Sequence, residues 1–141
     1  MQPVPSLAPA LVALQFVAFG WRINREISVG DQLRRTWIPL PDCLNLLSLV
    51  AVVTFCVVAP LCGYARATNA TLSAGYALIA FHPISEAAHY RLFSGAGRSV
   101  YLQKPGGDWP WITDQEIVSV LASATFASIA GCAAWHASSI G

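Results

Sequence analysis

Four long stretches of this sequence contain no charged residue, and they constrain the fold more than any other feature. They lie before Arg22, between Asp42 and Arg66, between Arg66 and Glu86, and after Glu116. A charge at the centre of a bilayer is costly, and a helix needs roughly 20 mainly apolar residues to cross the hydrocarbon core. The stretches therefore predict an all-α membrane protein whose apolar helices are joined by charged connections.

The overall composition supports the same class. Of the 141 residues, 55% are apolar and only 11% are charged. A soluble domain usually contains about 25% Asp, Glu, Lys and Arg, so a water-soluble fold of this size would have too few charges to cover its surface. The net charge of +1 offers no concentrated basic face of the kind that binds nucleic acid. We expect the lipid bilayer as a partner and no nucleic acid.

We expect a four-helix transmembrane bundle that forms a single polytopic membrane domain over residues 1–141. The expected spans cover residues 4–21, 43–65, 70–90 and 117–137. The third span is the least regular, because polar residues interrupt it and His82 is followed by Pro83. Three spans plus a re-entrant segment are therefore the alternative.

Lys and Arg are divided unequally between the expected connections. Connections 22–42 and 91–116 carry seven of them, and the connection between the second and third spans carries only Arg66. The positive-inside tendency then places both long connections in the cytoplasm and both termini on the non-cytoplasmic side. Three spans would put the two basic connections on opposite faces, so the count also favours four. A bacterial inner membrane is favoured over a eukaryotic organelle.

The two long connections carry further local signals. In connection 22–42, Gly30 and Asp31 are expected to break the segment. An interfacial helix lying against the headgroups explains its arginines, and a basic pocket for an anionic ligand is the sharper hypothesis. The residues of that pocket would be Arg22, Arg25, Arg34 and Arg35. In connection 91–116, strand-like residues 99–103 and a turn signal at 105–108 predict a short cytoplasmic hairpin-like loop.

Small residues recur every four positions along the last span. They are Ser119, Ser123, Ala127 and Gly131. Small side chains let helix backbones approach closely in lipid, so these residues, the small-residue ridge, are expected to pack against another helix. On this basis the first hypothesis is a protein that acts by helix association, as a homo-oligomer or as an accessory subunit of a membrane complex.

One group of residues could carry chemistry. His82, Glu86 and His89 lie at positions i, i+4 and i+7, which share one face of a continuous helix. Glu86 and His89 also have the Glu-x-x-His spacing of di-metal helix bundles, and imidazole with carboxylate binds Zn, Fe or Cu. Asp42 is expected at the same cytoplasmic boundary. A metal site of His82, Glu86 and His89 is thus an alternative.

Other considerations weigh against that site. Pro83 could begin the helix and leave His82 outside it, and three ligands from one helix rarely complete a site. His136, the best ligand on another helix, is expected at the opposite membrane face. No cofactor is therefore predicted, with a transition metal as the alternative.

No Ser-His-acid set, Walker motif or Rossmann fingerprint occurs in the sequence. The function class accordingly leans away from an enzyme. A membrane enzyme or metal-binding protein is the second hypothesis. An oligomeric channel or pore is the third, although the spans offer no inward ring of charge.

Overall fold

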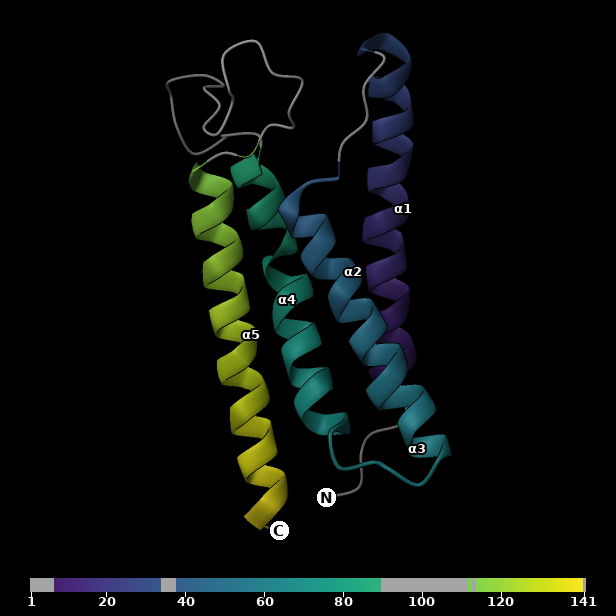
Figure 1. Cartoon of the computed structure of the whole chain (residues 1–141), viewed down its shortest axis with the longest axis vertical. Helices are drawn as coiled ribbons and strands as arrows, with labels where there is room; N and C mark the ends of the chain where they lie inside the picture. Colours follow the sequence, from purple (N-terminus) through teal and green to yellow (C-terminus); the bar gives the residue numbers. More distant parts are fainter. Residues whose placement is uncertain (1–6, 34–37, 90–111, 113, 141) are drawn as a thin grey trace.

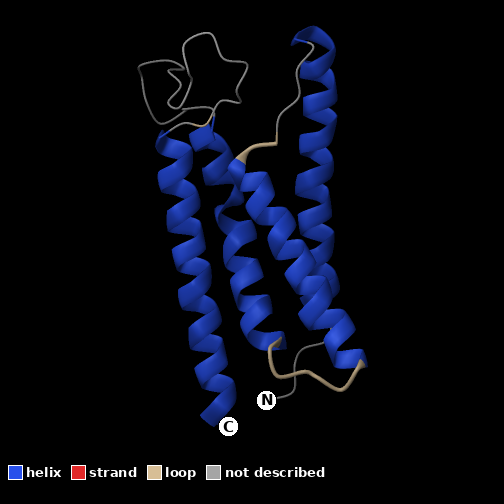
Figure 2. Ribbon diagram, in the orientation of Figure 1, coloured by secondary structure: helices blue, strands red, loops and turns tan. Residues whose placement is uncertain are grey.

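The computed structural model describes residues 7–33, 38–89, 112 and 114–140 (Figure 1). All the elements within these residues are helices, and no strand occurs among them (Figure 2). In chain order they are α1 (Leu7–Leu33), α2 (Leu40–Val52), the π-helix η1 (Val53–Val58), α3 (Ala59–Leu61), α4 (Thr68–His89) and α5 (Asp114–Ile140). The predicted all-α class is confirmed. The predicted hairpin-like loop lies mostly outside the described residues.

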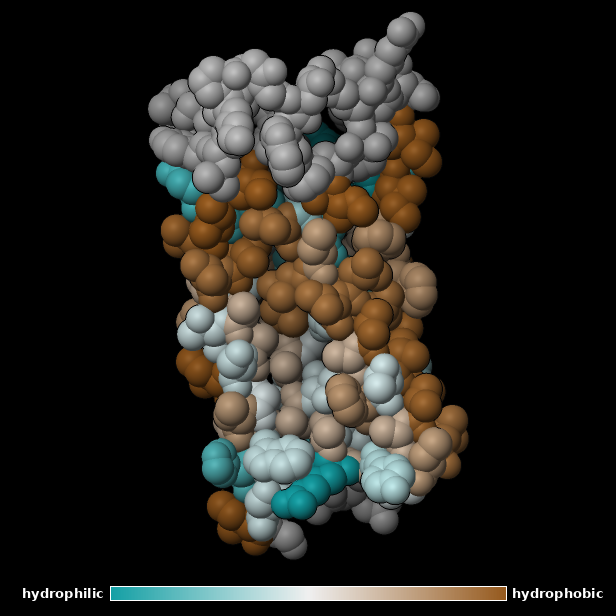
Figure 3. Space-filling view, in the orientation of Figure 1, coloured by the Kyte–Doolittle hydropathy of each residue, from teal (hydrophilic) through white to brown (hydrophobic). Residues whose placement is uncertain are grey.

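Among the described residues, three helices are long and apolar enough to cross a membrane. They cover Leu7–Arg25, Leu40–Leu61 and Asp114–Ile140. Many large apolar side chains project outward from these helices, and they contribute to the brown areas of the surface in Figure 3. Phe16, Leu47 and Leu121 are all exposed. Such a surface is typical of a protein that faces hydrocarbon, which agrees with the predicted membrane class.

The helices run side by side along the long axis of the molecule (Figure 1). α2, η1 and α3 follow one another without interruption. α4 packs against both α2 and α5, and α1 packs against α2. α2 begins, α4 ends and α5 begins at one end of the bundle, called here the upper end as it is drawn in Figure 1. The turn between α3 and α4 lies at the lower end.

Two sequence-based expectations about helix ends are wrong. α1 continues through Gly30 and Asp31 to Leu33, because a single glycine costs a helix only about 1 kcal/mol relative to alanine. Pro83 does not begin a helix but lies inside α4, and His82 is therefore helical. Proline removes one backbone N–H donor, and packed membrane helices tolerate that loss.

Pro60 follows shortly after the π-helix and has no backbone N–H to donate. In a π-helix an N–H pairs with the carbonyl five residues earlier, and for position 60 that carbonyl belongs to Phe55. The carbonyl of Phe55, five residues earlier, instead accepts a hydrogen bond from the Thr68 hydroxyl at 3.2 Å. The start of α4 thus compensates for the irregularity in the neighbouring helix.

The bundle interior has two chemically different parts. Toward the lower end, an apolar cluster joins α1, α2 and α4. It consists of Ala8, Leu11, Val52 and Leu72. Gly75 allows the close packing, since a Cβ atom there would lie 2.7 Å from Leu11 Cδ2 and 3.1 Å from Val52 Cγ2. Toward the upper end, most of the buried side chains are polar or charged, and Asp42, Glu86 and Glu116 are among them.

Candidate metal centre

Six ionisable side chains from four helices gather at the upper end. They are Arg22 on α1, Asp42 on α2, His82, Glu86 and His89 on α4, and Glu116 on α5. Asp42 and Glu116 each lie in the first turn of their helix, where the helix dipole favours a negative charge. Because α4 runs antiparallel to α2 and α5, its last turns meet these first turns.

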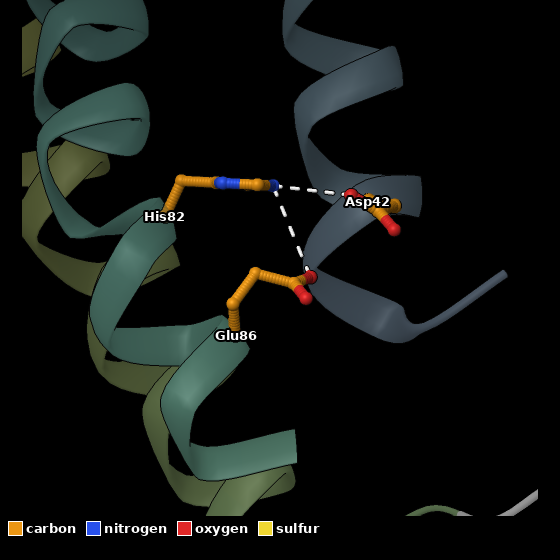
Figure 4. Close-up of side chains that lie close together, drawn as sticks. All are labelled: Asp42, His82 and Glu86. Carbon is orange, nitrogen blue, oxygen red and sulfur yellow. Dashed lines mark hydrogen bonds and ion pairs between the residues drawn. The ribbon is translucent and has the colours of Figure 1, made fainter. Parts of the chain in front are cut away.

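Asp42 is the centre of the first set of contacts. It is 0% exposed, and its Oδ2 atom accepts a hydrogen bond from Arg22 Nε at 2.9 Å. Its Oδ1 atom lies 3.1 Å from His82 Nε2. Figure 4 shows the His82 ring directed at Asp42 from the facing helix. Both oxygens of this buried carboxylate are therefore used.

Glu86 is also buried, but its carboxylate lacks the close hydrogen-bond donors that Asp42 has. Its exposure is 7%, and neither of its carboxylate oxygens accepts a hydrogen bond from any residue that the structure describes. The ion-pair contacts are long: Oε2 lies 4.0 Å from Arg22 Nε, and Oε1 lies 4.0 Å from His82 Nε2. A buried carboxylate without close donors is costly. Figure 4 shows it directed toward the same space as His82 and Asp42.

The spacing of these groups suits a bound cation. One ligand atom from each of Asp42, His82 and Glu86 lies within 4.8 Å of the others. Two ligands at about 2.1 Å from a tetrahedral metal are roughly 3.4 Å apart, so small side-chain rotations would close the set. Arg22 holds the far oxygen of Asp42, as outer hydrogen-bond partners of metal ligands commonly do.

His89 belongs to a second pair. Its Nδ1 atom lies 2.8 Å from Glu116 Oε2. Glu116 is 0% exposed, and its other oxygen, Oε1, accepts the backbone N–H of Leu40 at 2.8 Å. The predicted trio is thus divided: His82 and Glu86 lie with Asp42, whereas His89 contacts Glu116.

The arginines of the hypothetical anion pocket have different surroundings. Arg22 is buried against Asp42, and Arg25 is partly exposed on the next turn of α1. The other two, Arg34 and Arg35, lie outside the described residues. Arg22 therefore lies inside the bundle and pairs with the Asp42 carboxylate.

The small-residue ridge faces α4 of the same chain. Ser123 and Ala127 are buried, and Ser123 Oγ lies 3.1 Å from Ser85 Oγ. A Cβ atom added to Gly131 would lie 3.3 Å from the carbonyl oxygen of Ala70. Ser119 donates its hydroxyl to the Glu116 carbonyl. This ridge explains how α5 approaches α4 closely.

A further polar layer lies next to the ionisable residues, toward the middle of the bundle. Gln15 Nε2 donates to Ser48 Oγ at 2.8 Å, and Asn45 Nδ2 donates to the backbone oxygen of Gln15 at 3.4 Å. A pocket between α2, α4 and α5 is lined by Asn45, His82, Ser85 and Ser123 on its polar side. Its volume of about 10 Å³ is the space of about one water molecule.

Sequence reasoning missed Arg22 and Glu116 as members of the site. Asp42, Glu116 and Arg22 each adjoin a charge-free stretch. In an antiparallel bundle, residues at neighbouring helix ends meet at the same end of the bundle. The position of these three residues beside the charge-free stretches could therefore have predicted that they lie close together.

The comparisons with known proteins add nothing to this geometry: no family model, curated protein or solved structure matches the chain.

Proposed function

We propose that this chain is a multi-pass membrane protein that binds a divalent transition metal ion within its helix bundle. Asp42, His82 and Glu86 would be the ligands. The observation that carries the proposal is Glu86, a buried carboxylate whose oxygens accept no hydrogen bond from the described residues and which points toward an imidazole and a second carboxylate. A cation among the three groups would satisfy it.

Charge and ligand type narrow the class of ion. Asp42 and Glu86 carry two negative charges when ionised, and Arg22 supplies one permanent positive charge. A mixed set of imidazole and carboxylate suits Zn, Fe, Cu or Ni better than Mg or Ca, which prefer oxygen ligands only. No catalytic role is assigned to the centre.

The proposal includes an arrangement in the membrane. The three helices that are long and apolar enough to cross a bilayer would be joined by α4 as the fourth span, packed between α2 and α5. The excess of Lys and Arg in connections 22–42 and 91–116 supports a cytoplasmic upper end and non-cytoplasmic termini. The metal centre would then lie near the cytoplasmic boundary. The preference for a bacterial inner membrane stays a prediction.

Metal analysis of the purified full chain in mild detergent tests the proposal. We expect at least one Zn, Fe, Cu, Mn, Co or Ni ion per chain, as isolated or after reconstitution. Glu86→Gln keeps the shape of the side chain and removes its charge. It should weaken binding by more than the roughly 10–100-fold typical for loss of an outer hydrogen-bond partner.

The matched control is His136→Ala, which removes an exposed histidine of α5 and should leave the metal content unchanged. A chain that binds no metal under either condition would overturn the proposal. So would a Glu86→Gln variant that binds as tightly as the unchanged protein.

Association with itself or with other membrane subunits stays a second proposal, as does an oligomeric pore. The small-residue ridge gives association little support, because its residues pack on α4 of the same chain. An assembly would have to use the exposed face of α5 or another helix.

A further inference from the structure

The pocket between α2, α4 and α5 lies beside the proposed metal centre, because His82 forms part of its wall. The other polar side chains of the wall belong to Asn45, Ser85 and Ser123, which are 4%, 2% and 3% exposed. The space inside, about 10 Å³, admits one water molecule or one small ion. An organic ligand would not fit.

Asn45 has an acceptor that the described residues leave unused. Its Nδ2 atom donates to the backbone oxygen of Gln15 at 3.4 Å, but its buried Oδ1 atom accepts no hydrogen bond from them. Leaving a buried amide oxygen without a donor is costly. One residue in the wall of the pocket therefore needs a hydrogen-bond donor.

The two serines of the wall cannot supply that donor. Ser123 donates its hydroxyl to the backbone carbonyl of Ser119 at 2.7 Å, and a carbonyl can only accept. Ser85 Oγ and Ser123 Oγ are 3.1 Å apart. The hydrogen between them must then come from Ser85, because each hydroxyl has one hydrogen. Both hydroxyl hydrogens are thus used, and Ser85 Oγ can still accept a hydrogen bond.

His82 contributes a group that can either donate or accept. Its polar contacts with described residues are made through Nε2, which is directed at Asp42 (Figure 4). Nδ1 is the remaining polar atom of the ring, and an imidazole nitrogen donates or accepts according to its tautomer. Water has the same versatility, whereas a metal cation binds acceptors only. No carboxylate is among the described residues that line the pocket, so a neutral occupant also suits the charge.

We propose that this pocket binds one ordered water molecule, which donates a hydrogen bond to Asn45 Oδ1 and forms a second with His82 Nδ1. The water links α2 to α4 and holds the His82 ring in the rotation that directs Nε2 at Asp42. The water site itself requires no metal. Its role in orienting His82 as a ligand rests on the proposed metal-binding function, because metal-binding histidines commonly hydrogen-bond through their other nitrogen.

Nuclear Overhauser effects between water and leucine methyl groups test the water site in the metal-free full chain in mild detergent. Methyl hydrogens do not exchange with solvent, and Leu44 and Leu78 also line the pocket. At least one of them should show a cross-peak to water with the sign of a long-lived complex. Leu11 and Leu72, in the apolar cluster, should show none. Absence of the cross-peak at both Leu44 and Leu78 would overturn the proposal.

Two substitutions of Asn45 separate the water from the neighbouring hydroxyl groups. Asn45→Leu and Asn45→Asp both lose the amide that donates to Gln15, but only Asn45→Asp keeps an acceptor oxygen. The water cross-peak should disappear in Asn45→Leu and persist in Asn45→Asp. Ser48→Ala, the matched control, changes a buried residue of α2 that does not line the pocket, and it should keep the cross-peak. A cross-peak of unchanged strength in Asn45→Leu contradicts the proposal, because Asn45 would then hold no water.

Cu²⁺ bound to the full chain tests the link to His82. Electron spin echo envelope modulation detects the imidazole nitrogen remote from the copper, and its signal depends on hydrogen bonding at that atom. With Nε2 bound to copper this nitrogen is Nδ1, so Asn45→Leu should change the signal and weaken Cu²⁺ binding by roughly 10–100-fold. An unchanged signal would overturn the orienting role. A chain that binds no metal would instead overturn the proposed metal-binding function, while the water site is judged from the metal-free protein.

Discussion

The upper and lower halves of the bundle interior are built by the same helices from opposite kinds of residue. On α2, Asp42, Asn45 and Ser48 face the interior in the upper half, and Val52 continues the same buried face in the lower half. Leu11 and Leu72 complete the apolar part. The lower half shows that these helices can also pack through an apolar cluster.

That contrast bears on function. Replacing a buried ion pair with well-packed apolar residues is often neutral or stabilising, so stability gives little reason to bury five of these ionisable groups in the upper half. The apolar cluster of the lower half shows how the same helices pack when mainly apolar side chains are buried. The carboxylate oxygens of Glu86 accept no hydrogen bond from the described residues, and this difference from the lower half is what the proposed metal ion would account for.

The largest expected effect would come from breaking the upper half at Arg22. Arg22→Leu leaves Asp42 buried without its guanidinium partner, and loss of one member of a buried pair costs about 3–5 kcal/mol. Unfolding of the full chain by increasing dodecyl sulfate in mixed micelles measures this loss. Arg22→Leu/Asp42→Leu should be less destabilised than the single variant, because it removes both charges.

The lower end supplies the comparison for that experiment. Arg66 is exposed there, and its guanidinium lies 5.1 Å from the Trp135 ring. Exposed cation–π contacts contribute about 0.5–1 kcal/mol, so Arg66→Leu should cost no more than that. Equal losses for Arg22→Leu and Arg66→Leu would remove the distinction between a buried charge cluster and an ordinary end of the bundle.

The sequence predicted the apolar helices more readily than the contacts between them. Charge-free stretches predicted the apolar helices, because the cost of a charge in lipid acts on each helix separately. The helical spacing of His82, Glu86 and His89 predicted their shared face. Their partners Asp42 and Glu116 come from other helices, 40 and 27 residues away from His82 and His89. Only the packing of α2, α4 and α5 selects those pairings.

Pro83 shows a different limit of sequence reasoning. Local rules favour a helix end near a proline, yet α4 passes through it. In a packed membrane bundle an interrupted helix still has fewer unpaired backbone groups than a loop would have. The local preference is therefore outweighed, and His82 is kept on the same face as Glu86.

A smaller effect is expected from tightening the lower half. Gly75→Ala places a methyl group 2.7 Å from Leu11 Cδ2 and 3.1 Å from Val52 Cγ2, and overpacking of this kind costs about 1–3 kcal/mol. Gly20→Ala is the control, because no atom lies within 4 Å of its added Cβ. If Gly75→Ala is as stable as Gly20→Ala in the same unfolding assay, the apolar half is not closely packed at this point.

The smallest effect tests how the lower half compensates for Pro60. Thr68→Val keeps the side-chain shape and removes the hydroxyl that donates to the Phe55 carbonyl. Hydrogen bonds between membrane helices average about 0.6 kcal/mol, and we expect a loss of that size.

Thr125→Val is the matched control, because the Thr125 hydroxyl donates to Leu121 within its own helix and faces outward. Hydrogen exchange of the η1 amides should rise in Thr68→Val alone. Unchanged exchange there would mean that η1 does not depend on the Thr68 hydroxyl of α4.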